Sequence, residues 1–192
     1  MTGSLNTALI VGDMQSGILA NYPFSQTPLG PLRSVLSAAR AHSLLTVFVR
    51  TELRPSGIDV SDNNLLFKQF HEVGTLFHEG AGETAIASQL DAQSDDPIVT
   101  KRRTSVFTGT DFDLLLRAQR IETLVLTGVA TSAMIAATLL DALDRDYRVT
   151  VLSDACADGE PDVHDFLMER VFPARGAQVM TSTAWINQLE HY

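Results

Sequence analysis

The sequence predicts an α/β fold: a three-layer α/β/α sandwich with a doubly wound, mostly parallel six-stranded sheet of Rossmann-like type. Short segments rich in branched apolar residues recur along the chain, and they are too apolar to have a solvated face. Amphipathic segments of helical length separate them. The 192 residues are enough for one domain with a sizeable core. When strands and helices alternate, right-handed crossovers connect the successive strands. The result is a parallel sheet that helices cover on both sides.

The first expected strand, residues 8–12, has the sequence Ala-Leu-Ile-Val-Gly, and the second covers residues 44–50. Between them residues 31–42 are amphipathic, and Pro31 suits the first turn of a helix. The later elements follow the same alternation of apolar and amphipathic segments. The remaining expected strands are residues 97–100, 123–127, 148–153 and, most weakly, 177–181; the remaining helices are residues 111–120, 131–145, 163–172 and 182–189.

The segment of residues 51–96 departs from this alternation. It is rich in glycine and includes Pro55, and it has helix-like pieces at residues 61–71 and 83–90. It is too long for a plain connection and too patterned for a linker. We therefore expect a single domain over residues 1–192, with an insertion at about residues 51–96 that forms a lid or a subunit contact.

Charge and composition exclude several classes of function. The 14 basic and 23 acidic residues give a formal net charge of -9, and the longest basic run covers residues 101–103, so no nucleic-acid partner is expected. No apolar stretch approaches the roughly 20 residues that span a bilayer, so no membrane partner is expected. Residues 1–6 show no basic segment typical of a signal peptide. With Cys156 as the single cysteine, an intrachain disulfide is excluded and a cytoplasmic location is expected.

Three segments follow expected strands and can meet at one edge of the sheet. Asp13 follows the first strand, Lys101 follows the third, and residues 129–134 follow the fourth. Ligands of parallel sheets bind at the carboxyl ends of strands, near the point where the strand order reverses. A lysine beside an aspartate favours the ionised aspartate and can hold the pair ready for proton transfer. The alternatives are that Asp13 caps a turn and that Lys101 is a solvated member of a basic triplet.

Four blocks in order resemble the isochorismatase-like hydrolases, also called the cysteine hydrolase superfamily. The resemblance covers nearly the whole chain, and no single block is specific by itself. The blocks are Ala-Leu-Ile-Val-Gly-Asp-Met-Gln at residues 8–15, Lys-Arg-Arg-Thr-Ser-Val-Phe-Thr-Gly-Thr-Asp-Phe at 101–112, Leu-Thr-Gly-Val-Ala-Thr at 126–131 and Asp-Ala-Cys-Ala-Asp at 154–158.

The resemblance implies the same three-layer fold and a catalytic triad of Asp, Lys and Cys. It maps the acid/base to Asp13 and its partner to Lys101, while the position of the nucleophilic cysteine falls on Met134. The Val129–Ala130 bond matches a position that is often a cis peptide in relatives. There it aims backbone N–H groups, here those of Ala130 and Met134, at a developing oxyanion.

A thioether cannot form a thiolate, so Met134 excludes the usual covalent step. We expect a hydrolase of the isochorismatase family that acts on a small metabolite by Asp/Lys acid–base chemistry without a cysteine nucleophile. The alternative is a catalytically degenerate member that binds a small molecule or serves in assembly. A third alternative, a displaced nucleophile at Cys156, Ser132 or Thr131, is disfavoured. A free cysteine is usually a small buried hydrophobe, and hydroxyls at a helix start usually cap it.

The expected substrate-binding residues are Gln15, Phe107, Val129 and Thr131. Aromatic residues that could form apolar walls are Phe24, Phe67, Phe70, Phe77 and Phe107, and Arg50, Arg54 and Arg102 could recognise an anion.

No metal and no cofactor are expected, because the Asp-x-His pair that holds zinc in nicotinamidase-type relatives is missing after the second strand. His71 and His78 lie in the insertion without a partner at ligand spacing. The expected partners are a small-molecule substrate and, from the resemblance, further copies of the chain in a dimer or tetramer.

Overall fold

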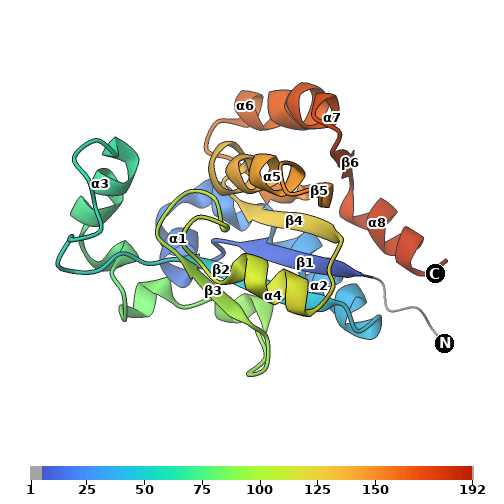
Figure 1. The fold of residues 1–192 in the computed structure, drawn as a ribbon, viewed down its shortest axis with the longest axis horizontal. Coiled ribbons are helices and arrows are strands. Elements are labelled where there is room, and N and C mark those ends of the chain that lie inside the picture. Colours follow the sequence, from blue (N-terminus) through green and yellow to red (C-terminus); the bar gives the residue numbers. More distant parts are fainter. Residues whose placement is uncertain (1–5, 192) are drawn as a thin grey trace.

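The computed structural model describes residues 6–191, and its centre is a sheet of six parallel strands (Figure 1). The strand order is β3-β2-β1-β4-β5-β6, so the order reverses between β1 and β4. The predicted α/β/α fold is confirmed. The strands are β1 (Thr7–Gly12), β2 (Leu45–Thr51), β3 (Ile98–Lys101), β4 (Thr123–Val129), β5 (Arg148–Ala157) and β6 (Gln178–Met180). Residues 1–5, on which the expectation of no signal peptide partly rests, lie outside the described residues.

Helices cover both faces of this sheet (Figure 1). One face is covered by α1 (Ser16–Asn21), α2 (Leu29–Ala41) and α8 (Ser182–Leu189). The other is covered by α4 (Phe112–Ala118), α5 (Ala136–Leu143) and α7 (Phe172–Ala174). Along this part of the chain there are also η1 (Pro23–Gln26), η5 (Thr131–Ile135), α6 (Pro161–Phe166) and η6 (Leu167–Val171). No helix of residues 6–191 is long and apolar enough to cross a membrane.

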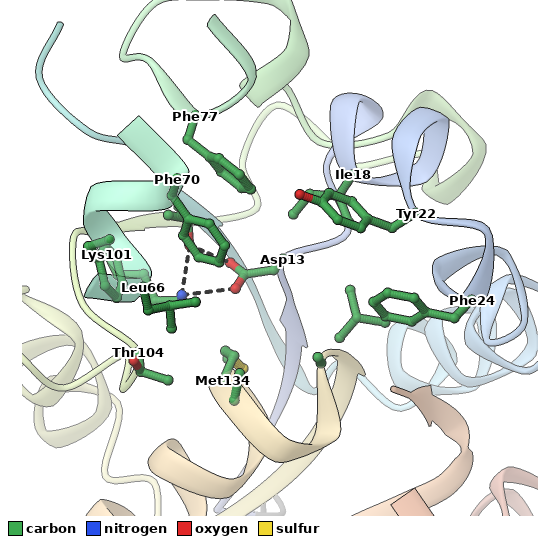
Figure 2. Close-up of a pocket in the computed structure, with 15 residues that line it drawn as sticks. Asp13, Ile18, Tyr22, Phe24, Leu66, Phe70, Phe77, Lys101, Thr104 and Met134 are labelled. Carbon is green, nitrogen blue, oxygen red and sulfur yellow. Dashed lines mark hydrogen bonds and ion pairs between the residues drawn. The ribbon is translucent and has the colours of Figure 1, made fainter. Parts of the chain in front are cut away.

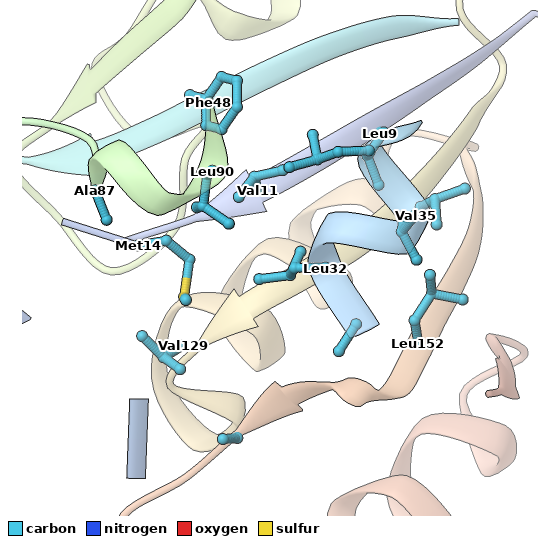
Figure 3. Packing of buried hydrophobic residues seen from close by; sticks show 14 of the residues in the cluster. Leu9, Val11, Met14, Leu32, Val35, Phe48, Ala87, Leu90, Val129 and Leu152 are labelled. Carbon is cyan, nitrogen blue, oxygen red and sulfur yellow. The ribbon is translucent and has the colours of Figure 1, made fainter. Parts of the chain in front are cut away.

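The alternation of side chains along β1 explains why both faces must be covered. Leu9 and Val11 belong to the core beneath α2 and α8 (Figure 3). Ala8 and Ile10 belong to the core beneath α4 and α5, and all four residues are fully buried. Successive residues of a strand point to opposite faces, so a strand that is apolar throughout needs a helical layer on each side.

The strand β5 continues four residues beyond its expected end at residue 153. The extension begins with the polar Asp154, which accepts hydrogen bonds at 2.6 Å from both the amide and the hydroxyl of Ser182. The carboxylate therefore has partners within the fold. The extension lets Cys156 pair with Gly128 of β4 after a register shift.

The insertion between β2 and β3 contains one α-helix, α3 (Leu65–Glu72), which stands out from the body in Figure 1. It also contains three 3₁₀ turns, η2 (Gly74–Phe77), η3 (Gly82–Thr84) and η4 (Ser88–Leu90). The expected helix at residues 83–90 is wrong. Residues 85–87 are extended because they pair with the start of α1: the Ser16 amide donates to the Ala85 carbonyl and the Ala87 amide to the Met14 carbonyl, each at 2.9 Å.

Candidate active site

The strands β3, β2, β1 and β4 bring four segments together at their carboxyl ends. Lys101 is the last residue of β3 and Thr51 the last of β2. Asp13 follows Gly12 directly after β1, and η5 begins two residues after β4. Asp13 lies in the left-handed region at φ 53°, and its amide donates to the Val49 carbonyl at 2.9 Å. Non-glycine residues in this region are uncommon and cluster at functional sites.

Asp13, Thr51 and Lys101 form a closed triangle of interactions (Figure 2). The Nζ of Lys101 lies 2.8 Å from Oδ2 of Asp13 and donates to Oγ1 of Thr51 at 2.7 Å. The Thr51 hydroxyl then donates to Oδ1 of Asp13 at 3.1 Å. The exposed fractions are 8% for Asp13, 2% for Thr51 and 2% for Lys101, so the ion pair is shielded from water.

Two opposing effects act on the carboxyl group of Asp13. Burial raises its pKa above the ordinary value, because the charged form loses its hydration. The positive charge and hydrogen bond of Lys101 oppose this shift, as does the hydrogen bond from Thr51, and the pKa remains raised. Such a carboxyl group keeps its proton to a higher pH than an exposed aspartate, which suits an acid that must donate a proton.

Gln15 anchors the backbone beside this triangle. Its Nε2 donates to the carbonyls of Thr51 at 3.1 Å and Thr84 at 3.2 Å, and its Oε1 accepts from the Thr51 amide at 2.8 Å. Because both ends of the fully buried side-chain amide are engaged with the backbone, Gln15 positions Thr51 and the insertion.

The turn between β4 and α5 starts with a cis peptide bond between Val129 and Ala130. The Ala130 carbonyl accepts from the amides of Ala133 at 3.1 Å and Ile135 at 3.2 Å, so η5 is a π-helical turn. π turns inside helices are rare and occur frequently at functional sites.

Partners from outside the cavity hold the same turn. The hydroxyl of Thr131 lies 2.8 Å from Nδ1 of His164, and the Ser132 amide donates to Oδ2 of Asp158 at 2.6 Å. Thr131 is fully buried and does not line the cavity. These contacts connect η5 to the loop after β5 and to α6.

A cavity of about 150 Å³ opens beside Asp13 and is mostly apolar (Figure 2). Its walls come from the segment after β1, the insertion, the segment after β3 and the β4–η5 turn. The lining residues are Asp13, Ile18, Tyr22, Phe24, Thr51, Leu66, Phe67, Phe70, Phe77, Lys101, Thr104, Val129, Ala130, Ala133 and Met134.

Met134 fills the corner of the cavity next to β1. Its side chain is 1% exposed, and a Cβ built on Gly12 would lie 2.4 Å from its sulfur. Gly12 in turn approaches Gly128 of β4 so closely that a Cβ on Gly128 would lie 2.1 Å from the Gly12 carbonyl oxygen. Glycine is needed at residue 128, where the backbone of β1 occupies the space of a side chain, whereas a side chain at residue 12 would require the end of the Met134 side chain to shift.

The structure brings some of the predicted site residues together and separates others. Asp13, Lys101, Val129, Ala130 and Met134 line the cavity. The other three, Gln15, Phe107 and Thr131, do not line it. Phe107 belongs to the core beneath α4 and α5, where its ring contacts Phe112 at a centroid distance of 4.9 Å.

The predicted aromatic walls Phe24, Phe67, Phe70 and Phe77 all line the cavity, whereas none of the three arginines does. Arg50 pairs with Glu52, Arg54 with Asp59, and Arg102 with both Asp59 and Glu79.

Thr51 and Tyr22 are site residues that the sequence analysis missed. Thr51 ends β2, the strand between those that supply Asp13 and Lys101. The rule that ligands bind at the carboxyl ends of strands could have identified it. Tyr22 lies between α1 and η1, two short elements that the apolar pattern did not predict.

Cys156 lies in the core, away from the cavity. Its Sγ lies 3.7 Å from the Leu126 carbonyl oxygen, and burial raises the pKa of the thiol far above its ordinary value. The reactive thiolate is therefore strongly disfavoured. Within residues 6–191, no group of three or more His, Cys, Asp or Glu side chains is arranged to hold a metal ion.

Known proteins share the sequence pattern and the fold of this chain. A family model described as Isochorismatase domain matches residues 7–184. The ureidoacrylate amidohydrolase RutB of Stutzerimonas stutzeri is 32% identical over 81% of this chain and 71% of its own length. A protein of Arabidopsis thaliana named as a probable inactive nicotinamidase is 30% identical over 83% of this chain and 84% of its own. The crystal structure of a cysteine hydrolase from Pseudomonas syringae pv. phaseolicola 1448A superposes with a TM-score of 0.86 at 25% identity, covering 98% of this chain and 94% of that one.

Proposed function

Since the chain belongs to the isochorismatase family of hydrolases, we propose that it cleaves a small metabolite by acid–base chemistry at Asp13 and Lys101, without a covalent cysteine intermediate. The observation that supports this most directly is the buried Asp13–Thr51–Lys101 triangle at the wall of the cavity. The desolvation of two buried charges offsets most of their attraction, so stability alone does not account for this pair and a role in function does.

We further propose that Met134 stands where the family's hydrolases have their nucleophilic cysteine. Met134 lines the cavity at the start of a helix, which is where a nucleophile would be placed, and its thioether sulfur is a poor nucleophile. The chemistry must then be carried by proton transfer and by electrostatic stabilisation.

Each group then has a defined role. Protonated Asp13 donates its proton to the substrate atom that accepts it, and Lys101 stabilises the carboxylate that remains. Thr51 holds both groups in orientation through its hydroxyl. The amides of Ala130 and Met134 donate to an oxygen that gains negative charge.

For a vinyl ether, Asp13 protonates the carbon, water adds to the oxocarbenium ion and returns its proton to the Asp13 carboxylate, and the C–O bond of the resulting hemiketal breaks to release an alcohol and a carbonyl compound. For a ureide or amide, ionised Asp13 takes the proton of the attacking water, the two amides stabilise the carbonyl oxygen that gains negative charge, and the C–N bond breaks as Asp13 returns the proton to the leaving nitrogen.

The test is turnover of a panel of vinyl ethers, amides and ureides by the parent protein and by the variants Asp13→Asn and Lys101→Met. Loss of a positioned acid or base lowers the rate by about 10²–10⁴-fold, and we expect kcat to fall by that factor in each variant. The matched controls are Asp111→Asn and Lys68→Met; Asp111 is exposed and Lys68 is the chain's other lysine, paired with the exposed Asp62. Unchanged rates in both site variants would refute the mechanism.

The second candidate is a protein of the same fold that binds a small molecule without converting it. The observation that favours it is Met134 itself, which fills a corner of the cavity with an unreactive side chain. This candidate predicts no turnover across the panel, together with an increase in Tm when the ligand is added. Gain of amidase activity in Met134→Cys would show that the surrounding groups are arranged for acyl chemistry.

A further inference from the structure

We propose that the cavity selects an uncharged small molecule with a ring and one polar group, and that it discriminates against carboxylates. This inference rests on the proposed function only in placing the ligand at Asp13. It concerns what the site binds rather than what it converts, so binding measurements can test it separately.

The charges of the lining residues cancel within the site. Of the 15 residues that line the cavity, Asp13 and Lys101 are the charged ones, and they pair with each other at 2.8 Å. A ligand carboxylate would therefore find no unpaired cation and would lie against the carboxylate of Asp13. Burial of an unpaired charge is strongly unfavourable, whereas a neutral polar group can use hydrogen bonds alone.

The nearby arginines are engaged elsewhere. Arg54 and Arg102 both contact Oδ2 of Asp59, at 3.0 and 3.1 Å. Arg103 donates to the Asp59 carbonyl at 2.9 Å, and its guanidinium carbon stacks over the ring of Phe67 at 5.7 Å from the centroid. None of these three residues lines the cavity. The cationic groups of this region are thus committed to the insertion.

The apolar walls determine the shape of the ligand. Phe70 and Phe77 lie on one side of Asp13, and Tyr22 and Phe24 lie on the other (Figure 2). The rings of Phe70 and Phe77 are stacked at a centroid distance of 4.5 Å. A planar ring between two aromatic groups gains dispersion and quadrupole contacts. The volume of about 150 Å³ lies below the ~300–1,000 Å³ typical of sites for drug-sized ligands, so it suits a single small ring.

The polar groups of the cavity lie at and beside Asp13. Asp13 lies between the two pairs of aromatic side chains, with Thr104 and Met134 on the side of Asp13 away from Phe77 (Figure 2). The hydroxyl of Thr51 donates to Asp13 at 3.1 Å. A ligand can therefore place one uncharged head at Asp13 and its ring against an aromatic pair.

The charge test compares benzamide with benzoate, which share a ring and a shape and differ in charge. At neutral pH, calorimetric titration of the parent protein is expected to give a Kd for benzamide about tenfold or more below that for benzoate, because the anion meets the Asp13 carboxylate and no unpaired cation. Equal or tighter binding of benzoate would overturn the proposal, and so would the absence of saturable benzamide binding.

A pair of charge-matched variants locates the discrimination. Leu66 lines the cavity at its mouth and is 40% exposed, so Leu66→Arg adds a cation that can reach the ligand. Its neighbour Leu65 is 68% exposed and does not line the cavity. We expect Leu66→Arg to shift the ratio of the two Kd values toward benzoate by about tenfold, and Leu65→Arg to leave it unchanged. The same shift in both variants would attribute the discrimination to overall charge and overturn the proposal.

The ring test uses Phe70→Ala, with acetamide as a probe that has the head group but no ring. Benzamide binding is expected to weaken about three- to tenfold while acetamide binding stays the same, because only the ring loses its contact. The control is Phe166→Ala on α6, where the side chain is exposed. Equal weakening of both probes would show that Phe70 has only a structural role and would remove the ring from the proposal.

Failure of the proposed function has a different signature. If Asp13→Asn and Lys101→Met convert substrates as well as the parent, the mechanism is refuted, but the benzamide preference of the parent protein still stands. If the parent binds benzoate as well as benzamide, the selectivity is refuted whether or not the protein is an enzyme.

Discussion

At the scale of single residues, the close contact between the Met134 thioether and Gly12 distinguishes this site. The thioether occupies the space next to Gly12 that any side chain there would need. It lines the cavity with a group that cannot ionise. The thiol of Cys156, the only one in the chain, lies buried in the core beneath α4 and α5. Residue chemistry at the site therefore depends on Asp13, Thr51 and Lys101.

The first residue-scale prediction concerns Cys156. Because burial raises the pKa of its thiol, Cys156→Ala is expected to leave turnover unchanged and to cost about 1 kcal/mol of unfolding free energy. An aromatic disulfide reagent should react with the native protein only as fast as the protein unfolds, and at once in denaturant. Loss of activity on alkylation without a change in Tm would instead identify Cys156 as a functional thiol.

At the scale of elements, the strand that supplies Lys101 also holds the insertion in place. The two residues after Lys101 are Arg102 and Arg103, and both contact Asp59 of the insertion. Asp59 also pairs with Arg54, close to the end of β2. The insertion supplies Phe67, Phe70 and Phe77 of the cavity, so these contacts hold one wall of the site against the sheet.

The element-scale prediction concerns this attachment. Asp59→Asn removes the anion shared by Arg54 and Arg102 and should lower the free energy of local opening by about 1–2 kcal/mol. Amide hydrogen exchange of residues 54–79 is expected to accelerate roughly tenfold, with the sheet unaffected. The control is Asp62→Asn, which breaks the exposed pair with Lys68. Acceleration in both variants to the same degree would mean that the Asp59 contacts do not hold the insertion.

At the scale of the whole molecule, two cores share one sheet, and the site lies where the order of its strands reverses. The core beneath α2 and α8 and the core beneath α4 and α5 meet through alternate residues of β1 and β4. The buried ion pair of Asp13 and Lys101 lies at the carboxyl end of these strands. Its ionisation therefore affects the stability of the entire fold.

The whole-molecule prediction concerns how the ionisation of Asp13 makes the free energy of unfolding depend on pH. The folded protein holds the proton of Asp13 more tightly than the unfolded chain, because burial raises its pKa above the unfolded value of about 3.9. The resulting stabilisation is complete below the unfolded pKa and is lost as the pH rises through the folded pKa. Asparagine does not ionise, so the unfolding free energy of the parent minus that of Asp13→Asn should fall as the pH rises above about 4.

Urea unfolding followed by the fluorescence of Trp185, the single tryptophan, measures this difference at each pH. The exposed Asp111→Asn serves as the control and should give a difference that changes little with pH. A difference that grows with pH would show that the attraction of Lys101 outweighs the burial of Asp13.

Some of the site could be predicted from the sequence because its residues follow recognisable strands. Asp13 and Lys101 come directly after apolar segments, and a charged residue in that place is a visible signal. Thr51 gives no such signal, because threonine is a common strand residue and its role depends on distances to two other strands. Gln15 and Phe107 looked like candidates for substrate contact, but hydrogen bonds and packing in three dimensions place both outside the cavity.

The fold could also be predicted in large part, because its strands are recognisable apolar segments of the sequence. Apolar periodicity located all six strands, with β5 ending later because Ser182 satisfies Asp154. It failed at residues 83–90, where pairing with residues 14–16 outweighs local helical preference. Short elements such as α1 lack enough residues to show a period.

The sequence by itself determined the α/β architecture, the positions of Asp13 and Lys101 and the presence of methionine at residue 134, because these depend on local composition and order. Only the tertiary structure decided that Thr51 links the aspartate to the lysine, that the arginines bind the insertion rather than the cavity, and that aromatic side chains lie on two sides of Asp13. Those features depend on contacts between segments far apart in the chain. Their geometry exists only once the strands lie side by side.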